Sequence, residues 1–260
     1  MKTIVANWKM YVGTRESIAL ARGVLLALRG KKVLPHMVVC PPAVALSEVR
    51  KVVARSHVAL GGQNISWLVQ GAQTGEMTAR MLSELGATHV LVGHSERRHQ
   101  LGENDEMVQK KMAAALTAGL TPILCVGETR EEREAGRAKE VVGAQLHAVF
   151  AHTQPRTRDR FFVAYEPVWA IGTGVPATPA DAVEMHTFIR THLHEMGKGL
   201  RDEQFSILYG GSVDGKNAYT FLRESAVDGV LVGSASVKLA QFSEILGAAM
   251  DVLEAQAVTK

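Results

Sequence analysis

The segment FFVAYEPVWAIGTG, residues 161–174, holds the pattern that decides the fold. It opens with an apolar and aromatic run, Phe161–Tyr165, in which charged and polar residues do not alternate with apolar ones. That pattern is typical of a strand buried on both faces, as in a parallel sheet. Glu166 ends the run and Pro167 follows it, so neither a strand nor a helix continues through this point. The segment therefore predicts a buried strand that delivers a carboxylate at its carboxyl end.

Short apolar runs of the same kind recur along the whole chain. They are rich in Val, Ile and Leu and comprise Thr3–Ala6, Met37–Cys40, Val58–Leu60, His89–Val92, Thr121–Val126, Phe161–Tyr165, Phe205–Tyr209 and Gly229–Val232. Amphipathic helical patterns lie between them, at Arg15–Leu28, Ala43–Ala54, Asp105–Ala118, Glu131–Phe150, Ala180–Met196 and Phe242–Ala257. Thr78 and Thr178 precede helical patterns and are expected as N-caps.

An alternation of strand and helix over 260 residues suits either an open doubly wound sheet or a closed barrel. The number of repeats and the length favour a (β/α)8 TIM barrel, with eight parallel strands surrounded by helices. No stretch reads as a linker, so residues 1–260 are expected to form a single domain. In such barrels the active site lies at the carboxyl ends of the strands.

Composition excludes several classes of partner. The net charge is only +3, and no block of Lys and Arg reads as a nucleic-acid-binding arm. No apolar run reaches the roughly 18 residues that a membrane span needs, and MKTIVANWK lacks the apolar core of a signal peptide. We therefore expect no nucleic-acid or membrane partner and a cytoplasmic location. Cys40 and Cys125 lie in apolar runs and are expected as buried free thiols.

Polar residues and glycines follow most of the expected strands. They are Asn7-Trp8-Lys9, Gly93-His94-Ser95-Glu96, Cys125-Val126-Gly127-Glu128, Glu166-Pro167, Gly210-Gly211-Ser212 and Gly233-Ser234. Taken alone, Glu166 reads as a cap, His94 as a structural histidine, and Lys9 as a solvated charge. In one barrel these strand ends converge on a single mouth, which favours a shared site.

This set of side chains fits proton transfer on a small phosphorylated sugar. Glycine turns expose backbone N–H groups that hold a phosphate. A carboxylate such as Glu166 removes a proton from a carbon next to a carbonyl, while neutral His94 polarises that carbonyl. Lys9 adds fixed positive charge where an enediolate develops. GxGxxG and P-loop motifs are missing and the histidine spacing suits no metal, so we expect neither a cofactor nor a metal.

With these residues assembled, the sequence resembles the triosephosphate isomerase family over essentially its whole length. The motifs are NWKM at 7–10, GAQTGE at 71–76, GHSERR at 93–98, CVGE at 125–128, YEPVWAIGTG at 165–174, YGGSV at 209–213 and the turn at Gly233. The resemblance implies interconversion of dihydroxyacetone phosphate and D-glyceraldehyde 3-phosphate, in glycolysis and gluconeogenesis. The same catalytic set leaves open an isomerase of a four-carbon keto-sugar phosphate. Its completeness argues against a catalytically inactive phosphate-binding barrel.

The resemblance also implies a role for each matching residue. Glu166 would be the catalytic base, His94 the neutral electrophile, and Lys9 and Asn7 the groups that hold and polarise the substrate, with Glu96 paired to Lys9. The implied phosphate donors are the backbone N–H groups of Gly172, Ser212, Gly233 and Ser234. The implied lid consists of Pro167, Val168, Trp169, Ala170, Ile171, Gly172, Thr173, Gly174, Val175 and Pro176.

A homodimer is implied by the segment Gly71–Glu76, which matches the loop that docks beside the partner's active site. Its tip would comprise Thr74, Gly75 and Glu76, with Thr74 near the partner subunit's Asn7; a tetramer is left open. Four neighbouring residues are unusually apolar for a loop and suit either a buried loop base or an interface, namely Ile65, Trp67, Leu68 and Val69.

Several positions depart from the family pattern. They are Ala6, Tyr11, Gln73, Val175-Pro176 and Ser234. Gln73 is expected to alter the dimer contact, whereas Ser234 is expected to keep its role because a backbone donor needs no glycine. Proline fixes φ, so Pro176 predicts an altered rate of lid opening. Closure kinetics that stay unchanged in Pro176→Thr would contradict that expectation.

Overall fold

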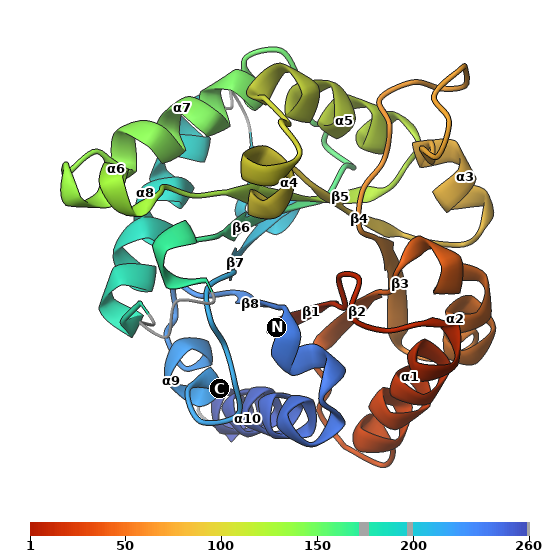
Figure 1. Cartoon of the computed structure of the whole chain (residues 1–260). Coiled ribbons are helices and arrows are strands. Elements are labelled where there is room, and N and C mark those ends of the chain that lie inside the picture. Colours follow the sequence, from red (N-terminus) through yellow and green to blue (C-terminus); the bar gives the residue numbers. More distant parts are fainter. Residues whose placement is uncertain (172–176, 197–199, 259–260) are drawn as a thin grey trace.

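The computed structural model describes residues 1–171, 177–196 and 200–258. Eight strands form a closed barrel in the order β1-β2-β3-β4-β5-β6-β7-β8, and every neighbouring pair is parallel. Figure 1 shows this ring of strands with the helices arranged around it. The predicted (β/α)8 barrel is therefore confirmed.

The strands lie where the apolar runs predicted them, within two residues at each end. They are β1 Thr3–Asn7, β2 His36–Cys40, β3 Val58–Gly62, β4 His89–Val92, β5 Thr121–Val126, β6 Phe161–Tyr165, β7 Phe205–Tyr209 and β8 Gly229–Val232. The α-helices are α1 Thr14–Leu28, α2 Leu46–Val53, α3 Ala79–Glu84, α4 Ser95–Gln100, α5 Asp105–Thr117, α6 Arg130–Glu134, α7 Ala138–Phe150, α8 Pro179–Met196, α9 Ala218–Leu222 and α10 Leu239–Val258. Short 3-10 turns are η1 Ala43–Ala45, η2 Val168–Ala170, η3 Asp202–Gln204 and η4 Ser234–Val237.

Two predicted helices are each divided in the structure. The pattern at Ala43–Ala54 forms η1 followed by α2, and the pattern at Glu131–Phe150 breaks into α6 and α7. The second break lies at Gly136, whose φ of +71° is the left-handed conformation that ends helices. Helices α4 and α9 were not predicted, because neither is long enough to display an apolar repeat.

Both predicted N-caps are present. Thr78 Oγ1 accepts a hydrogen bond from the Met81 N–H at 3.2 Å, and Thr178 Oγ1 accepts one from the Asp181 N–H at 3.2 Å. Each bond satisfies an N–H group that the helix cannot pair internally. These caps fix where α3 and α8 begin.

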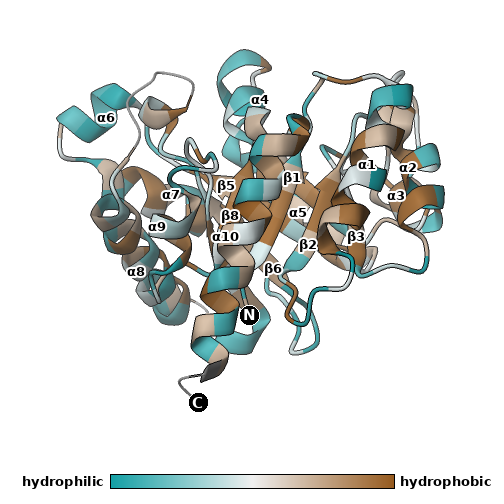
Figure 2. Ribbon diagram, turned by 90° about the horizontal axis from the view of Figure 1, so that it is seen from below, coloured by the Kyte–Doolittle hydropathy of each residue, from teal (hydrophilic) through white to brown (hydrophobic). Residues whose placement is uncertain are grey.

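The core has two layers. The larger lies between the strands and the helices, and a smaller one fills the barrel interior with residues such as Val5, Leu91 and Leu231. Figure 2 shows the strands as a hydrophobic centre flanked by helices with hydrophilic outer faces. Cys40 and Cys125 are buried free thiols in the inner layer, as predicted. Burial raises the pKa of the Cys40 thiol to about 12.

No helix in the described part of the chain is long and apolar enough to cross a membrane.

Candidate active site

A cavity of about 310 Å³ opens at the carboxyl ends of the strands. Its lining brings together residues that are far apart in the sequence: Asn7, Lys9, Tyr11, His94, Glu166, Ile171, Gly210, Gly211, Ser212, Val213, Asp214, Asn217, Leu231, Gly233, Ser234, Ala235 and Gln241. Of the predicted catalytic residues only Glu96 is absent from this lining. Glu96 is paired to Lys9, which does line the cavity.

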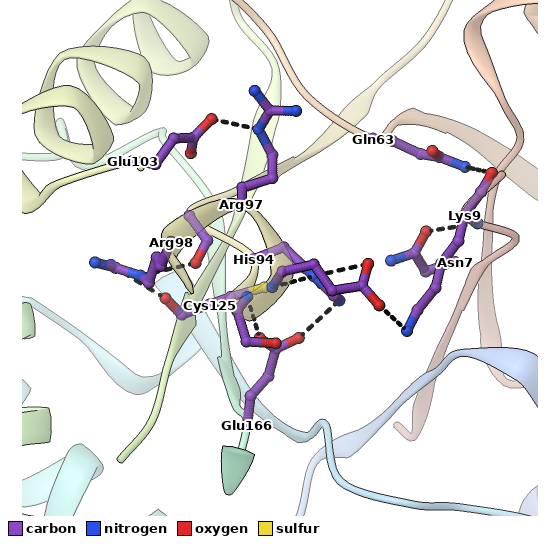
Figure 3. A network of polar contacts seen from close by, with 12 residues as sticks. Asn7, Lys9, Gln63, His94, Arg97, Arg98, Glu103, Cys125 and Glu166 are labelled. Atoms are coloured by element: carbon purple, nitrogen blue, oxygen red, sulfur yellow. Dashed lines mark hydrogen bonds and ion pairs between the residues drawn. The ribbon is translucent and has the colours of Figure 1, made fainter. Parts of the chain in front are cut away.

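Glu166 lies directly after β6 with a side chain that is only 2% exposed. Its Oε2 accepts a hydrogen bond from the Ser95 N–H at 2.8 Å, and its Oε1 lies 3.1 Å from His94 Nε2 (Figure 3). The backbone at this point is tightly constrained by β5. A Cβ added at Gly127 would lie 1.7 Å from the Glu166 carbonyl oxygen, so only glycine fits there.

His94 is the N-cap of α4, and the turn before it is made by Gly93 with φ of +69°. The ring Nδ1 accepts a hydrogen bond from the Glu96 N–H at 3.3 Å. An accepting Nδ1 carries no proton, so the geometry assigns a neutral imidazole with its proton on Nε2. The Nε2–H group therefore serves as a donor that faces Glu166 and the cavity.

Lys9 has a left-handed backbone, with φ of 48°, which is uncommon for a residue other than glycine. Three contacts hold it there. Its N–H donates to Asn7 Oδ1 at 3.0 Å, and its carbonyl accepts from Gln63 Nε2 at 2.8 Å. Its Nζ pairs with Glu96 Oε1 at 2.6 Å. The ammonium group is thereby aimed at the cavity, close to Gly233.

Glycine-rich turns form the opposite wall of the cavity. A Cβ added at Gly211 would lie 2.2 Å from the Tyr209 hydroxyl, so glycine is required where the chain turns out of β7. Gly233 and Ser234 lead from β8 into η4. Turns of this kind expose backbone N–H groups suited to an anion.

The described part of the predicted lid, Pro167–Ile171, is anchored at its base by Glu128. This carboxylate is fully buried and accepts hydrogen bonds from the Tyr165 hydroxyl at 2.9 Å and from Trp169 Nε1 at 2.8 Å. Arg133 Nη1 lies 3.5 Å from the same oxygen, and its guanidinium lies over the Trp169 ring at 5.2 Å. Burial and the neighbouring Glu128 raise the pKa of the Tyr165 hydroxyl. The base of the lid is therefore held by charged and hydrogen-bonded side chains around Glu128.

Further along the lid, Ala170 accepts a hydrogen bond from Ser212 Oγ at 2.7 Å, and Ile171 lines the cavity. The remaining predicted lid residues lie outside the described residues, as does one predicted phosphate donor: these are Gly172, Thr173, Gly174, Val175 and Pro176.

Sequence reasoning missed the groups that hold the site in place. Ser95 contributes a backbone N–H, which has no sequence signature of its own. Glu128 stands in the CVGE motif and Gln63 directly follows β3, but their partners lie 41 and 54 residues away, respectively, at Trp169 and Lys9. The one signal that both residues share is a polar side chain just after a buried strand.

The predicted dimer loop does not line the cavity of its own chain. Asn64 Nδ2 donates to Glu76 Oε2 at 3.3 Å and Ser66 Oγ donates to Gln73 Oε1 at 2.5 Å, which ties the loop together. Its apolar residues, which were expected either as a buried loop base or as part of an interface, differ in how far they are buried. Ile65 is fully buried as a loop base, whereas Val69 is 72% exposed.

Among the residues that the structure describes, no group of three or more His, Cys, Asp and Glu side chains is arranged to hold a metal ion.

Comparison with known proteins identifies the family of this chain. The model of the family described as triosephosphate isomerase matches residues 2–249. A triosephosphate isomerase of Roseiflexus sp. is 47% identical over 94% of this chain and 95% of its own length. The protein of the same name from Aquifex aeolicus is 42% identical over 94% of this chain and 98% of its own. That of Treponema pallidum is 45% identical over 93% of this chain and 96% of its own.

Proposed function

The chain belongs to the triosephosphate isomerase family and interconverts dihydroxyacetone phosphate and D-glyceraldehyde 3-phosphate, a step of glycolysis, and from this premise we propose how its residues perform the reaction. The observation that carries the proposal is the meeting of Glu166, His94 and Lys9 at one cavity. A carboxylate, a neutral imidazole and an ammonium group are the three charge types that an enediolate intermediate requires.

In the proposed first step, the Glu166 carboxylate removes a proton from carbon 1 of dihydroxyacetone phosphate. The electron pair of that C–H bond forms the C1–C2 double bond, and the carbonyl oxygen on C2 gains negative charge. Nε2–H of His94 donates to that oxygen, and the imidazole then passes a proton between the oxygens on C1 and C2. Protonated Glu166 returns its proton to C2, which gives glyceraldehyde 3-phosphate.

Burial explains why these groups work as a unit. Glu166 and His94 are 2% and 8% exposed at the side chain, so water does not screen the developing charge. Lys9 supplies a fixed positive charge, which Glu96 and the Asn7 amide hold in one position. A donor that is already in place requires no reorganisation when charge appears. Glu166 Oε2 accepts a hydrogen bond from the Ser95 N–H at 2.8 Å, and in the proposed reaction it exchanges that bond for contact with the substrate.

We assign phosphate binding to the wall formed by Ser212, Gly233 and Ser234, with Gly172 completing it from the lid. Lys9 faces this wall, so a dianion bound there also gains from the ammonium charge. Closure of the lid segment Pro167 to Pro176 would then exclude water from the enediolate.

Isosteric replacement of the acid–base groups tests these roles. We expect Glu166→Gln and His94→Gln each to lower kcat/KM by at least about 10²-fold, because each removes one proton-transfer group. The measurement is a coupled assay in both directions, with proton exchange from solvent followed in D2O. His57→Gln, at an exposed surface position, serves as the control.

Wild-type turnover and exchange in Glu166→Gln would contradict its role as the base. A tetrulose phosphate assayed in parallel tests the four-carbon alternative. We expect it to react far more slowly than the triose phosphates.

We propose further that the protein is a homodimer of the cytoplasm. The exposed Val69 and the exposed tip at Thr74 and Gly75 support a contact with a second copy, and the free buried thiols suit a reducing compartment. Analytical ultracentrifugation should give twice the 28.1 kDa of one chain. Thr74→Arg should shift the protein toward the monomer, and a monomeric wild type at micromolar concentration would refute the dimer.

A further inference from the structure

The amino end of the barrel, opposite the active site, is closed by aromatic rings from alternate strands. His36 is the first residue of β2, His89 is the first of β4, and Phe162 lies near the start of β6. Their ring centroids lie 5.2 Å (His36–His89), 6.0 Å (His36–Phe162) and 5.6 Å (His89–Phe162) apart. Strand β3, between the two histidine strands, contributes the small residues Ala59 and Gly61, and a Cβ added at Gly61 would lie 3.4 Å from the His89 Cβ.

The two histidine rings converge through one nitrogen each. His36 Nε2 and His89 Nε2 lie 3.3 Å apart and share a hydrogen bond, with ring centroids 5.2 Å apart and ring planes inclined by 46°. A bound ion would take the place of the shared proton, which moves to the Nδ1 of the donor ring. Two imidazoles bound to one tetrahedral zinc ion at about 2.0–2.1 Å have their nitrogens about 3.4 Å apart. The observed separation therefore matches that of two ligands of one metal ion.

The orientation of His89 is fixed by an outer partner. Its Nδ1 lies 2.8 Å from Thr88 Oγ1, and in the tautomer that carries its proton on Nδ1 the ring donates to the hydroxyl and leaves the Nε2 lone pair available. Metal-binding histidines commonly have such a partner on the second nitrogen, which sets the tautomer. Burial lowers the pKa of both histidines, that of His89 to about 3, so that both rings are neutral ligands at pH 7.

The pair opens onto a cavity of about 670 Å³ at the barrel floor, which gives an ion and its water ligands access. Charged side chains line the same cavity: Asp228 and Asp202 pair with Arg190 at 2.6 Å and 2.8 Å, and Arg160 and Glu203 stand in the same lining. The two aspartates offset the positive charge of Arg190 and so lower the cost of placing a cation nearby.

We propose that His36 and His89 bind one divalent transition-metal ion, with Zn²⁺ as its representative, through their Nε2 atoms and with water in the remaining coordination positions. The ion joins β2 to β4 across β3 at the end of the barrel opposite the catalytic cavity. Its role is to cross-link the barrel, and it takes no part in isomerisation. The proposal is independent of the assigned catalytic roles, and it departs from the sequence-based expectation of no metal. Spacing along the chain did not reveal the pair, because its members are 53 residues apart.

The test uses the untagged full chain, stripped with EDTA and titrated with ZnCl2 by calorimetry, and with Co²⁺ by visible absorption. We expect one equivalent of Zn²⁺ and Co²⁺ bands typical of a low-coordinate site. His36→Gln and His89→Gln should each weaken binding at least tenfold. Thr88→Val, which removes only the outer partner, should weaken it about tenfold. The matched control His57→Gln removes an exposed histidine elsewhere and should bind as the wild type does.

Isomerase activity serves as the test of folding, because none of these residues lines the catalytic cavity. Thr88 is exposed and His36 half-buried, so these variants keep the test usable if His89→Gln does not fold. The proposal is overturned if the wild type binds no Zn²⁺ up to millimolar concentration. It is overturned equally if the active His36→Gln and Thr88→Val variants bind Zn²⁺ as tightly as the wild type.

Discussion

At the scale of the residue, Lys9 supplies a positive charge to the cavity, whereas its partner Glu96 holds that charge in position. Lys9 lines the cavity, whereas the Glu96 carboxylate lies outside that lining and pairs with Lys9 at 2.6 Å. Lys9→Gln removes a cation that faces the enediolate, and we expect kcat/KM to fall by about 10²–10³-fold. Glu96→Gln keeps the cation but loosens its position, so we expect a smaller loss, about tenfold. Steady-state kinetics on both variants test this difference. Equal losses of kcat/KM would mean that catalysis depends on the ion pair and not on the ammonium group alone.

Glu128 is a second residue whose effect follows from burial. It is fully buried and accepts hydrogen bonds from Tyr165 and Trp169, with Arg133 beside it. Glu128→Ala removes the acceptor of the buried Tyr165 hydroxyl, whereas Arg133 keeps its ion pair with Asp181, and the change should destabilise the fold by about 2–3 kcal/mol. Glu128→Gln retains an acceptor of the same shape and should cost about 1–2 kcal/mol.

Urea unfolding followed by circular dichroism measures both losses. If the alanine variant is no less stable than the glutamine variant, the carboxylate is not the anchor of the lid base.

The sequence revealed which residues react, and it did not reveal what holds them. Glu166, His94 and Lys9 each follow a buried strand, and a barrel brings such positions together, so their convergence follows from topology. The bond from the Ser95 N–H to Glu166 and the left-handed backbone of Lys9 depend on local geometry that neither residue type specifies. Backbone donors and dihedral angles are not specified by any particular residue type in the sequence.

At the scale of the element, β5 and β6 must approach closely for Glu166 to reach the cavity. Gly127→Ala places a Cβ 1.7 Å from the Glu166 carbonyl oxygen, so the two strand ends must separate. Displacement of a catalytic group by about 1 Å costs about 10²-fold in rate, and we expect a loss of at least that size in kcat.

Gly247→Ala is the matched control for that substitution. It lies inside α10, and an added Cβ there meets no atom within 4 Å. Helix propensity predicts a gain of about 0.5–1 kcal/mol in stability with unchanged activity. Comparable kinetics in the two alanine variants would show that the β5–β6 approach does not position the base.

Elements were predictable in proportion to their length. The eight buried strands and the longer helices repeat a pattern over enough residues to be recognised. Helix α4 has the sequence SERRHQ, in which no apolar repeat exists, and it is held by the His94 cap and the turn at Gly93. The division between α6 and α7 depends on Gly136 adopting a positive φ, which the sequence permits but does not require.

At the scale of the whole molecule, closure of the barrel is what the sequence predicted best. Eight strands that are apolar on both faces need helices outside and side chains inside, and a closed ring supplies both without an exposed edge. The amino end of the barrel was not anticipated. His89 is the first residue of a predicted apolar run, where it reads as part of the strand, and His36 stands just before another run. Pairing of His36 with His89 emerges only once β3 is placed between β2 and β4.

Buried histidines also make the stability of the whole molecule depend on pH. His186, in α8, is fully buried, and its Nδ1 lies 3.2 Å from the Ala226 carbonyl oxygen. Burial is the largest cause that lowers the pKa of His186, to about 3, against 6.5 in the unfolded chain. Between these values the unfolded chain binds more protons, so acid favours unfolding. Stability is complete above pH 6.5 and falls as the pH drops toward 3, with a loss of about 2 kcal/mol from this residue at pH 5.

Replacing His186 by glutamine removes that titration and keeps a hydrogen-bond donor for Ala226. We expect His186→Gln to be less stable than the wild type at pH 8 but to lose about 2 kcal/mol less between pH 8 and pH 5. Urea unfolding at both pH values, in EDTA to keep metal ions away from the barrel floor, measures the difference. His57→Gln, which replaces an exposed histidine, should follow the wild type at both pH values. If His186→Gln shows the same pH dependence as the wild type, the burial of His186 does not set the acid sensitivity of this barrel.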